Sequence, residues 1–365
     1  MLVQLPAINR ESPPPRHPWT SSLVLVLVLL IPLAVACGGS GAADDGGQDL
    51  LINLPADEGA HQAGIEWWYF NGHLTDDSAR DYSFHFVTFQ IGTSQAAGDV
   101  SQAGQMLQLS WGDHTEQVFL TGEKVSLVTP GATPGSFALD LSGWQMSGDG
   151  KQYKLAFDPG GYSVTLIAVS LKPAVFHQRT GFVKLGPAGE TFYYTRPRLE
   201  ISGTLTIDGV PRPVSGTGWM DHQWGEFVSR QAGWDWMSLQ LDDGSELMAV
   251  LVWDPEGRQP FTSYGTYVTA DGAVRHLVDG DVILTPTGSW TSPSTGIVYP
   301  MGWDLSVEPL ELELTLTPAQ QNAEYPKSRY GPPGYWEGAV SLAGTVGGSP
   351  VTGKGFVELV GYRSE

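Results

Sequence analysis

The stretch from residue 216 to residue 227, Gly-Thr-Gly-Trp-Met-Asp-His-Gln-Trp-Gly-Glu-Phe, places a carboxylate, an imidazole and two indoles close together after a glycine-rich bend. If this stretch is a strand, its side chains alternate between two faces, so Asp221 and His222 point in opposite directions. A few polar groups among large aromatic side chains are typical of a small-molecule pocket. The closed end of a β-barrel has the same composition, so the motif predicts either a ligand site or barrel closure.

Three residues near such aromatic runs are candidates for acid–base catalysis. His222 is a candidate because a histidine can titrate near neutral pH and transfer protons, although a buried histidine in a core is also common. Glu66 precedes the run Trp-Trp-Tyr-Phe, and a carboxyl group buried against indoles has a raised pKa; a salt bridge to a surface arginine is the alternative. Asp221 is either a proton-handling group or a structural acceptor that closes a barrel, with Arg198 as a candidate partner.

Large aromatic residues are the candidate ligand contacts. Trp224 could stabilise positive charge by a cation–π interaction, and the further candidates are Trp219, Tyr69 and Trp236. Tryptophans in these runs also pack barrel ends, and that role is expected for Trp67, Trp68, Trp234 and Trp236. Together these residues predict an apolar or amphipathic small molecule as the partner.

The elements that must position these residues are strands. The chain has 46 glycines and 13 each of Trp, Tyr and Phe, and apolar stripes at helical spacing are scarce. Alternating runs at 66–74 and 82–91 flank Asp-Asp-Ser, and a run at 199–207 is followed by Asp208-Gly209, which is a strong hairpin signal. The sequence therefore predicts an all-β protein.

Internal repetition divides the chain. Residues 67–77 resemble residues 234–243, and 201–221 resemble 342–358, so Asp221 corresponds to Glu358 and Trp67 to Trp234. At the position of His222 the second copy has Leu359, so the fold does not demand an imidazole there. These parallels predict two tandem antiparallel β-barrels related by internal duplication, the N-terminal one at 50–228 and the C-terminal one at 229–365.

The N-terminal residues predict export. Basic residues precede an apolar run at 23–36 that ends in small residues, which indicates a signal peptide over 1–36. Cys37, the sole cysteine, follows directly and resembles the lipidated cysteine of bacterial lipoproteins, and 37–49 reads as a flexible linker. An ordinary cleaved signal or a short buried helix is the alternative. We expect an extracytoplasmic lipoprotein whose lipid at Cys37 anchors it to the cell membrane.

Charge and motif content argue against several function classes. A formal net charge of −20 disfavours nucleic acid as a partner. His73 and His85 lie on neighbouring predicted strands, but no recognised metal-ligand spacing accompanies them, so we expect neither a metal nor a cofactor. The chain has no Gly-x-Ser-x-Gly elbow, so a serine hydrolase is not supported.

The aromatic motifs of both halves resemble the AttH/carotenoid 1,2-hydratase family. The motifs that carry the resemblance are 66–70, 171–173, 192–194, 218–225 and 355–362. The resemblance implies two packed lipocalin-like barrels and, in the hydratases, an acid that protonates a C=C bond before water adds. The family's His-x-Trp corresponds to His222 and Trp224. Its Tyr-x-Asp has no clean match, and the region 251–254 offers Asp254 without the tyrosine.

Two functions remain from the sequence. The first is an acid–base enzyme acting on a C=C bond of an apolar substrate bound between the two barrels. The second is a non-catalytic binding or carrier protein for a lipid or isoprenoid. Catalysis requires His222 or Glu66 to face a cavity within hydrogen-bond reach of a carboxylate or water.

Overall fold

The computed structural model describes residues 51–92, 104–126, 134–326 and 334–364, and nearly all of its regular structure is antiparallel strand. Cys37 and the rest of the predicted signal and linker lie outside these residues. The strands of the first sheet are β1 (Ile65–Asp76), β2 (Asp81–Ile91), β3 (Gly104–Asp113), β4 (Val118–Ser126), β5 (Phe137–Leu141), β6 (Trp144–Gly148), β7 (Gln152–Phe157), β8 (Tyr162–Ser170), β9 (Val175–Phe176), β10 (Phe182–Lys184), β11 (Gly189–Ile207) and β12 (Val210–Phe227).

The second sheet begins after a short connection that follows Phe227. Its strands are β13 (Gly233–Leu241), β14 (Glu246–Trp253), β15 (Pro260–Val268), β16 (Val274–Leu277), β17 (Val282–Pro286), β20 (Trp303–Val307), β21 (Leu312–Pro318), β22 (Glu324–Tyr325), β23 (Tyr335–Val346) and β24 (Ser349–Val360). A separate hairpin is formed by β18 (Ser289–Thr291) and β19 (Val298–Pro300), and the short 3-10 helices are η1 (Ala56–Glu58), η3 (Gly186–Ala188), η4 (Ser229–Gln231) and η5 (Glu308–Leu310).

Local sequence accounts for these strands. The hairpin between β11 and β12 turns at Asp208-Gly209, where φ is 51° and 80°. Two positive φ angles in succession define the turn that matches the twist of paired strands, and Asp-Gly adopts it readily. In β8 inward and outward side chains alternate, with Val164, Leu166 and Ala168 buried.

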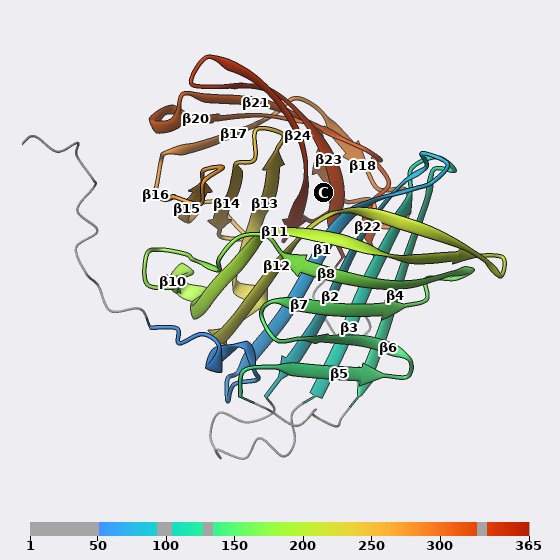
Figure 1. Cartoon of the computed structure of the whole chain (residues 1–365). Coiled ribbons are helices and arrows are strands. Elements are labelled where there is room, and N and C mark those ends of the chain that lie inside the picture. Colours follow the sequence, from blue (N-terminus) through green and yellow to red (C-terminus); the bar gives the residue numbers. More distant parts are fainter. Residues whose placement is uncertain (1–50, 93–103, 127–133, 327–333, 365) are drawn as a thin grey trace, which may run out of the picture. The chain divides into compact units, whose positions relative to one another are not determined.

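The two sheets repeat one topology. The strand order is β4-β3-β2-β1-β12-β11-β8-β7-β6-β5 in the first and β16-β15-β14-β13-β24-β23-β21-β20-β17 in the second. Figure 1 shows each sheet curling round on itself, the first in blue to yellow-green and the second in yellow to red. Each is a nearly closed antiparallel barrel, so the prediction of two tandem all-β barrels is confirmed.

Strand register aligns the two copies residue by residue. Tyr69 on β1 pairs with Asp221 on β12, and Trp236 on β13 pairs with Glu358 on β24. Asp221 and Glu358 therefore occupy equivalent places, as the repeat predicts. The equivalent of His222 is Leu359.

The alternation of side chains along each strand decides which of them fill the barrels and which lie between the barrels. Trp68 and Trp224 belong to the core of the first barrel, whereas Trp67 and Trp236 point outward into an apolar layer between the barrels. Of the tryptophans expected to pack barrel ends, Trp68 alone lies inside a barrel; Trp67, Trp234 and Trp236 lie on outer faces, because each differs from Trp68 in parity along its strand.

Polar contacts join the barrels at equivalent positions. His73 Nε2 lies 3.1 Å from the carbonyl oxygen of Gly355, and Gln240 Nε2 donates to that of Gly218 at 2.8 Å. Glu246 on β14 is fully buried and accepts from Lys172 and Arg198 of the first barrel at 2.7 and 2.5 Å. Arg198, a candidate partner of Asp221 by sequence, therefore pairs with Glu246 instead.

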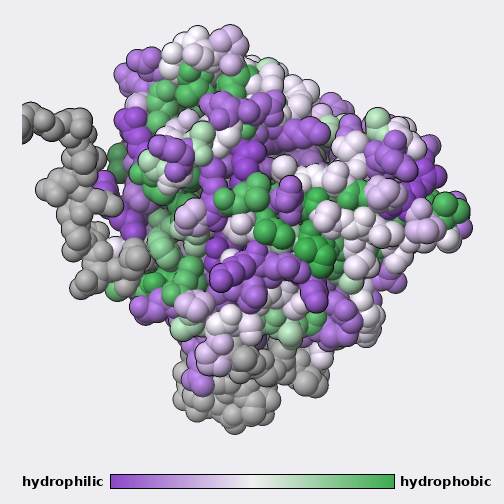
Figure 2. All heavy atoms as spheres, viewed as in Figure 1, coloured by the Kyte–Doolittle hydropathy of each residue, from purple (hydrophilic) through white to green (hydrophobic). Residues whose placement is uncertain are grey.

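The surface is mixed in character. Figure 2 shows a face on which hydrophilic side chains cover much of both sheets, with hydrophobic side chains scattered among them. Across the part of the chain that the structure describes, no helix is both long and apolar enough to span a membrane.

Candidate functional site

A cavity of about 520 Å³ lies between the outer faces of the two barrels. Its walls combine the indoles of Trp67, Trp234 and Trp236, the phenols of Tyr69, Tyr193, Tyr264 and Tyr335, aliphatic side chains such as Val87, Met106, Val250 and Val252, and the carboxyl groups of Asp221, Glu337 and Glu358. An apolar chamber with a few convergent polar groups is the usual form of a small-molecule site. The exposed residues Val228 and Arg230, in the connection between the barrels, form part of its rim.

Two of the cavity carboxyl groups are cross-strand neighbours. Glu337 on β23 pairs directly with Glu358 on β24, and both line the cavity. The Tyr69 hydroxyl donates to Glu337 Oε1 at 2.5 Å, which brings a group from the first barrel onto a carboxyl of the second. Trp234 Nε1 donates to Glu358 Oε2 at 2.8 Å.

Burial raises the pKa values of both carboxyl groups. Burial raises the pKa of Glu358 to about 7, and the nearby Asp221 adds to the rise while Trp234 opposes it. Burial raises the pKa of Glu337 well above its ordinary value, and repulsion from Glu358 raises it further. Because the pKa values of both carboxyl groups are raised, one of them can hold a proton while the other accepts one, so the pair can supply both an acid and a base.

The other carboxyl, Asp221, closes a hydrogen-bonded chain across the cavity wall. It accepts from Trp219 Nε1 at 2.8 Å and from the Tyr193 hydroxyl at 2.7 Å, and Trp236 Nε1 of the second barrel donates to that hydroxyl at 3.1 Å. Burial raises the pKa of Asp221 to about 6, although its three side-chain hydrogen bonds oppose the shift.

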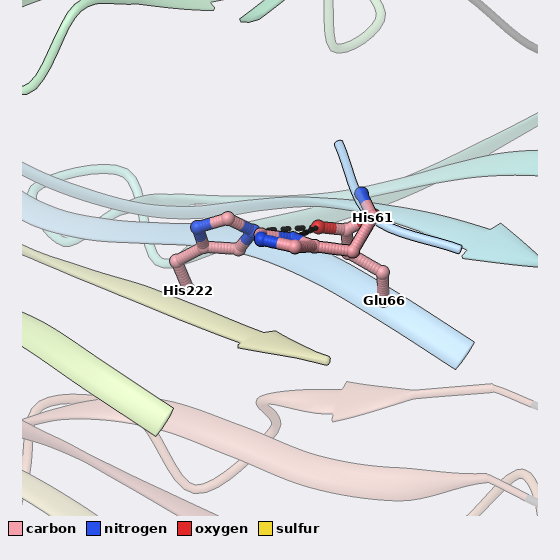
Figure 3. Close-up of side chains that lie close together, drawn as sticks. All are labelled: His61, Glu66 and His222. Carbon is pink, nitrogen blue, oxygen red and sulfur yellow. Dashed lines mark hydrogen bonds and ion pairs between the residues drawn. The ribbon is translucent and has the colours of Figure 1, made fainter. Parts of the chain in front are cut away.

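A second cluster of titratable groups lies inside the first barrel, at one end of β1. Glu66 Oε1 lies 2.8 Å from His222 Nε2 and 2.7 Å from His61 Nδ1 (Figure 3). Glu66 and His222 are buried, and His61 lies in the segment that precedes β1 with 21% of its side chain exposed. Burial would raise the pKa of Glu66, but the hydrogen bonds from His222 and His61 outweigh burial and lower it.

The cluster continues inward from His222. Its Nδ1 lies 3.1 Å from the Tyr194 hydroxyl, which donates to Glu58 Oε2 at 2.8 Å; Glu58 also accepts from Arg196. Burial lowers the pKa of His222, although Glu66 opposes the shift, so its imidazole is neutral near neutral pH. The ligand atoms of His61, Glu66 and His222 lie within 4.8 Å of one another and form a group able to hold a metal ion.

The structure divides the residues predicted from sequence between these two places. Asp221, Tyr69 and Trp236 line the cavity. Trp219 lies behind this lining and donates a hydrogen bond to Asp221. Glu66, His222 and Trp224 lie inside the first barrel.

Asp254 belongs to neither group. It follows β14, and its carboxylate accepts from the backbone N–H groups of Glu256 and Gly257 at 3.1 and 2.9 Å. These bonds hold a turn, and the described residues that line the cavity do not include it.

Sequence reasoning missed two important residues, Glu337 and His61, and assigned no chemical role to Glu358. Glu337 lies between Trp336 and Gly338 in a largely apolar strand, and only its register opposite Glu358 marks it as a candidate. Glu358 itself was visible as the counterpart of Asp221. His61 lies in irregular structure, where no periodicity marks it, and its position depends on how residues 51–64 fold against the barrel.

Solved structures share this architecture over most of the chain. An AttH protein from Nitrosomonas europaea is 28% identical, with a TM-score of 0.76, and the match covers 85% of this chain and 97% of that one. Kievitone hydratase from Nectria haematococca is 18% identical, with a TM-score of 0.69, and the match covers 86% and 94% respectively, which shows a common fold.

Curated relatives match over a shorter length. Kievitone hydratase of Fusarium solani subsp. phaseoli is 23% identical over 194 residues, which are 49% of this chain and 51% of that protein. Dehydratase asqC of Emericella nidulans is 24% identical over 187 residues, 49% and 53% respectively. The chain thus spans about half the length of the curated relatives it matches.

The family comparison covers both barrels. The model of a family described as AttH-like matches residues 47–362, which include every strand that contributes to the cavity and to the His61–Glu66–His222 cluster. The chain belongs to the AttH-like family.

Proposed function

We propose that this protein is an acid–base enzyme of the hydratase or dehydratase class, acting at a C=C bond of an apolar or amphipathic small molecule held between the barrels. The observation that carries the proposal is the pair Glu337 and Glu358, neighbouring carboxyl groups with raised pKa values that face one aromatic cavity. The names of the relatives, a hydratase and a dehydratase, describe the two directions of one reaction and support this reading.

In the direction of hydration, Glu337 is the acid. Its protonated carboxyl group delivers a proton to one alkene carbon, so that a C–H bond forms as the π bond breaks and the other carbon becomes cationic. The indoles of Trp234 and Trp236, which line the same cavity, stabilise that cation through their faces. An apolar cavity protects the cation because it excludes water except next to its few polar groups.

Glu358 acts as the base in the second half of the reaction. A water molecule forms the C–O bond while Glu358 removes one of its protons, which gives a neutral alcohol. Proton transfer from Glu358 to the neighbouring Glu337 restores the starting state. Dehydration follows the same steps in reverse, and a pKa near 7 for Glu358 suits both directions.

The test uses water enriched in the heavy oxygen isotope, with kievitone and a set of isoprenoid alkenes as probes. Mass spectrometry should detect a product that carries the heavy oxygen, and Glu337→Gln or Glu358→Gln should lower its formation by about 100-fold or more. Asp235→Asn is the matched control, because Asp235 is a half-buried carboxyl with a pKa raised to about 6 by desolvation, yet it lies outside the described lining of the cavity.

Two outcomes separate enzyme from carrier. Loss of labelled product in both glutamine variants, with activity retained in the Asp235→Asn variant, supports catalysis. Native mass spectrometry that finds a probe bound to the wild-type protein, with no isotope incorporated for any alkene, would contradict the enzymatic proposal and support the carrier reading instead.

We also propose that the protein acts outside the cytoplasm, anchored by a lipid on Cys37. The apolar run at 23–36 and the glycine-rich residues after Cys37 support this location. Cys37→Ser should move the protein from the membrane pellet to the soluble fraction. Retention of the variant in the pellet would contradict lipidation.

A further inference from the structure

We infer that the first barrel contains a binding site for a divalent transition-metal ion, formed by His61, Glu66 and His222 and separate from the cavity between the barrels. Two imidazoles and one carboxylate point their ligand atoms at a common place (Figure 3). This donor set suits Zn²⁺ and the neighbouring first-row ions rather than Ca²⁺ or Mg²⁺, which prefer oxygen ligands. The inference departs from the expectation based on sequence, which considered motif spacing alone.

The remaining atom of each ligand already has an outer partner. His61 Nε2 lies 3.5 Å from Asp57 Oδ1, His222 Nδ1 lies 3.1 Å from the Tyr194 hydroxyl, and Glu66 Oε2 accepts from the backbone N–H of His61 at 2.9 Å. Metal-binding histidines characteristically use their second nitrogen in this way, which fixes the tautomer and the ring orientation.

These partners also accommodate the protons that a metal displaces. Without an ion, Glu66 Oε1 receives a hydrogen bond from each imidazole. With an ion, each imidazole must present a lone pair there and carry its proton on the other nitrogen. Asp57 can accept the proton of His61 Nε2. Tyr194 can accept that of His222 Nδ1, because its own hydroxyl proton is donated to Glu58.

Aromatic stacking holds both rings in place. The His61 ring lies parallel to Trp224, with centroids 3.9 Å apart and an interplanar angle of 2°, and His222 stacks on Trp68 at 4.6 Å. A preorganised set of ligands lowers the entropy cost of binding. With three protein ligands, and with His61 partly exposed, the ion keeps an open position for water or another ligand from the solvent side.

The experiment titrates the tag-free, metal-depleted full chain with Zn²⁺ and Co²⁺. We expect one ion per chain by calorimetry, visible absorption bands of a low-symmetry Co²⁺ complex, and a rise in Tm on addition of Zn²⁺. Glu66→Gln preserves the shape of the ligand but removes its charge, so it should weaken binding by about 100-fold or more and abolish both the Co²⁺ spectrum and the Tm shift.

His114→Gln is the control, since His114 is a partly buried histidine whose Nε2 lies 2.9 Å from Ser83 Oγ, in a different part of the first barrel. It should bind Zn²⁺ as the wild type does. A second variant, Asp57→Asn, neutralises the outer partner of His61. The asparagine oxygen can still accept from the backbone N–H of Asn53, as Asp57 Oδ2 does, so the variant should weaken binding by roughly tenfold without unfolding the barrel. Wild-type protein that binds neither ion, or Glu66→Gln protein that binds as tightly as wild type, would overturn the inference.

Discussion

The interiors of the two barrels differ at positions that their shared topology makes equivalent. In the first barrel His222 pairs with Tyr194 across β12 and β11, and both are buried in a polar cluster. In the second barrel Leu359 and Trp336 hold the same places and belong to the apolar core. A barrel of this topology therefore closes equally well with apolar side chains there.

The difference shows that the fold does not require the polar cluster. Buried polar groups cost free energy unless each is hydrogen-bonded, and partial satisfaction is worse than an apolar core. Glu66, His222, Tyr194 and Glu58 are each hydrogen-bonded, but only through a chain of partners that ends at Arg196. Such an arrangement is typical of a binding or catalytic site rather than of barrel closure.

The outer faces, by contrast, share a carboxyl group at one equivalent position in the two barrels. Asp221 and Glu358 stand at the same register, and each accepts a hydrogen bond from an indole N–H. The cavity between the barrels uses both copies of this feature, whereas the cluster at Glu66 belongs to one copy alone. Duplication thus accounts for Asp221 and Glu358 in the cavity wall, whereas Glu337, whose counterpart in register is Thr195, and the interior cluster each belong to one copy.

The largest effect on stability is expected when His222 of the first barrel is replaced by leucine, the residue at the equivalent position of the second barrel. His222→Leu removes a partner of Glu66 and of Tyr194, and it should lower the free energy of unfolding by about 3 kcal/mol because a buried ionised group loses part of its pair. Leu359 at the equivalent position suggests that leucine is tolerated at position 222 at little cost. The hydrogen bonds of His222 to Glu66 and Tyr194 predict a larger cost. Urea denaturation measures the effect.

A double variant sharpens the same comparison. Glu66→Leu combined with His222→Leu removes the charge together with its partner, so the loss should be smaller than the sum of the single losses by about 1 kcal/mol or more. Additive losses would mean that the two residues do not stabilise each other and that the contrast between the interiors has another origin.

An effect of intermediate size is expected in the pH dependence of stability, through Glu358 on the outer face of the second barrel. The folded pKa of Glu358 is about 7, against an ordinary value of 4.5, so the folded state holds a proton that the unfolded state has released. Its contribution to stability is complete below about pH 4.5 and is lost as the pH rises through about 7.

Comparison with Glu358→Gln isolates this contribution. The difference in unfolding free energy between wild type and variant should fall by on the order of 1–3 kcal/mol from about pH 4.5 to about pH 7. Urea denaturation at several pH values measures it. A difference that stays constant would show that the cavity does not shift the pKa of Glu358, and one that grows with pH would show that its pKa is lowered instead.

The smallest effect is expected at Asp254, which the sequence offered as a catalytic carboxylate. Asp254→Asn keeps one of the two acceptor oxygens that hold the turn, so it should lower stability by no more than about 1 kcal/mol and leave ligand binding unaltered. Thermal melts and fluorescence of the cavity tryptophans test this. A large loss of binding would extend the site beyond the cavity and the interior cluster.

The sequence by itself determined the strands, the duplication and the orientation of each side chain along its strand. Alternation is a property of neighbouring residues, so the separation of Asp221 from His222 follows from parity alone. The repeat likewise identified Leu359 as the counterpart of His222 and Glu358 as that of Asp221. These features are local or come from comparing two stretches of the same chain.

Only the tertiary structure decided which faces meet. The cavity exists because the outer faces of β1 and β12 pack near those of β13 and β24, and it brings Tyr69 onto Glu337, 268 residues further along the chain. His61 reaches Glu66 because an irregular segment folds across the end of the barrel. Neither contact has a periodic signature, since the packing of whole surfaces depends on side chains from many strands at once, and no single stretch of sequence encodes it.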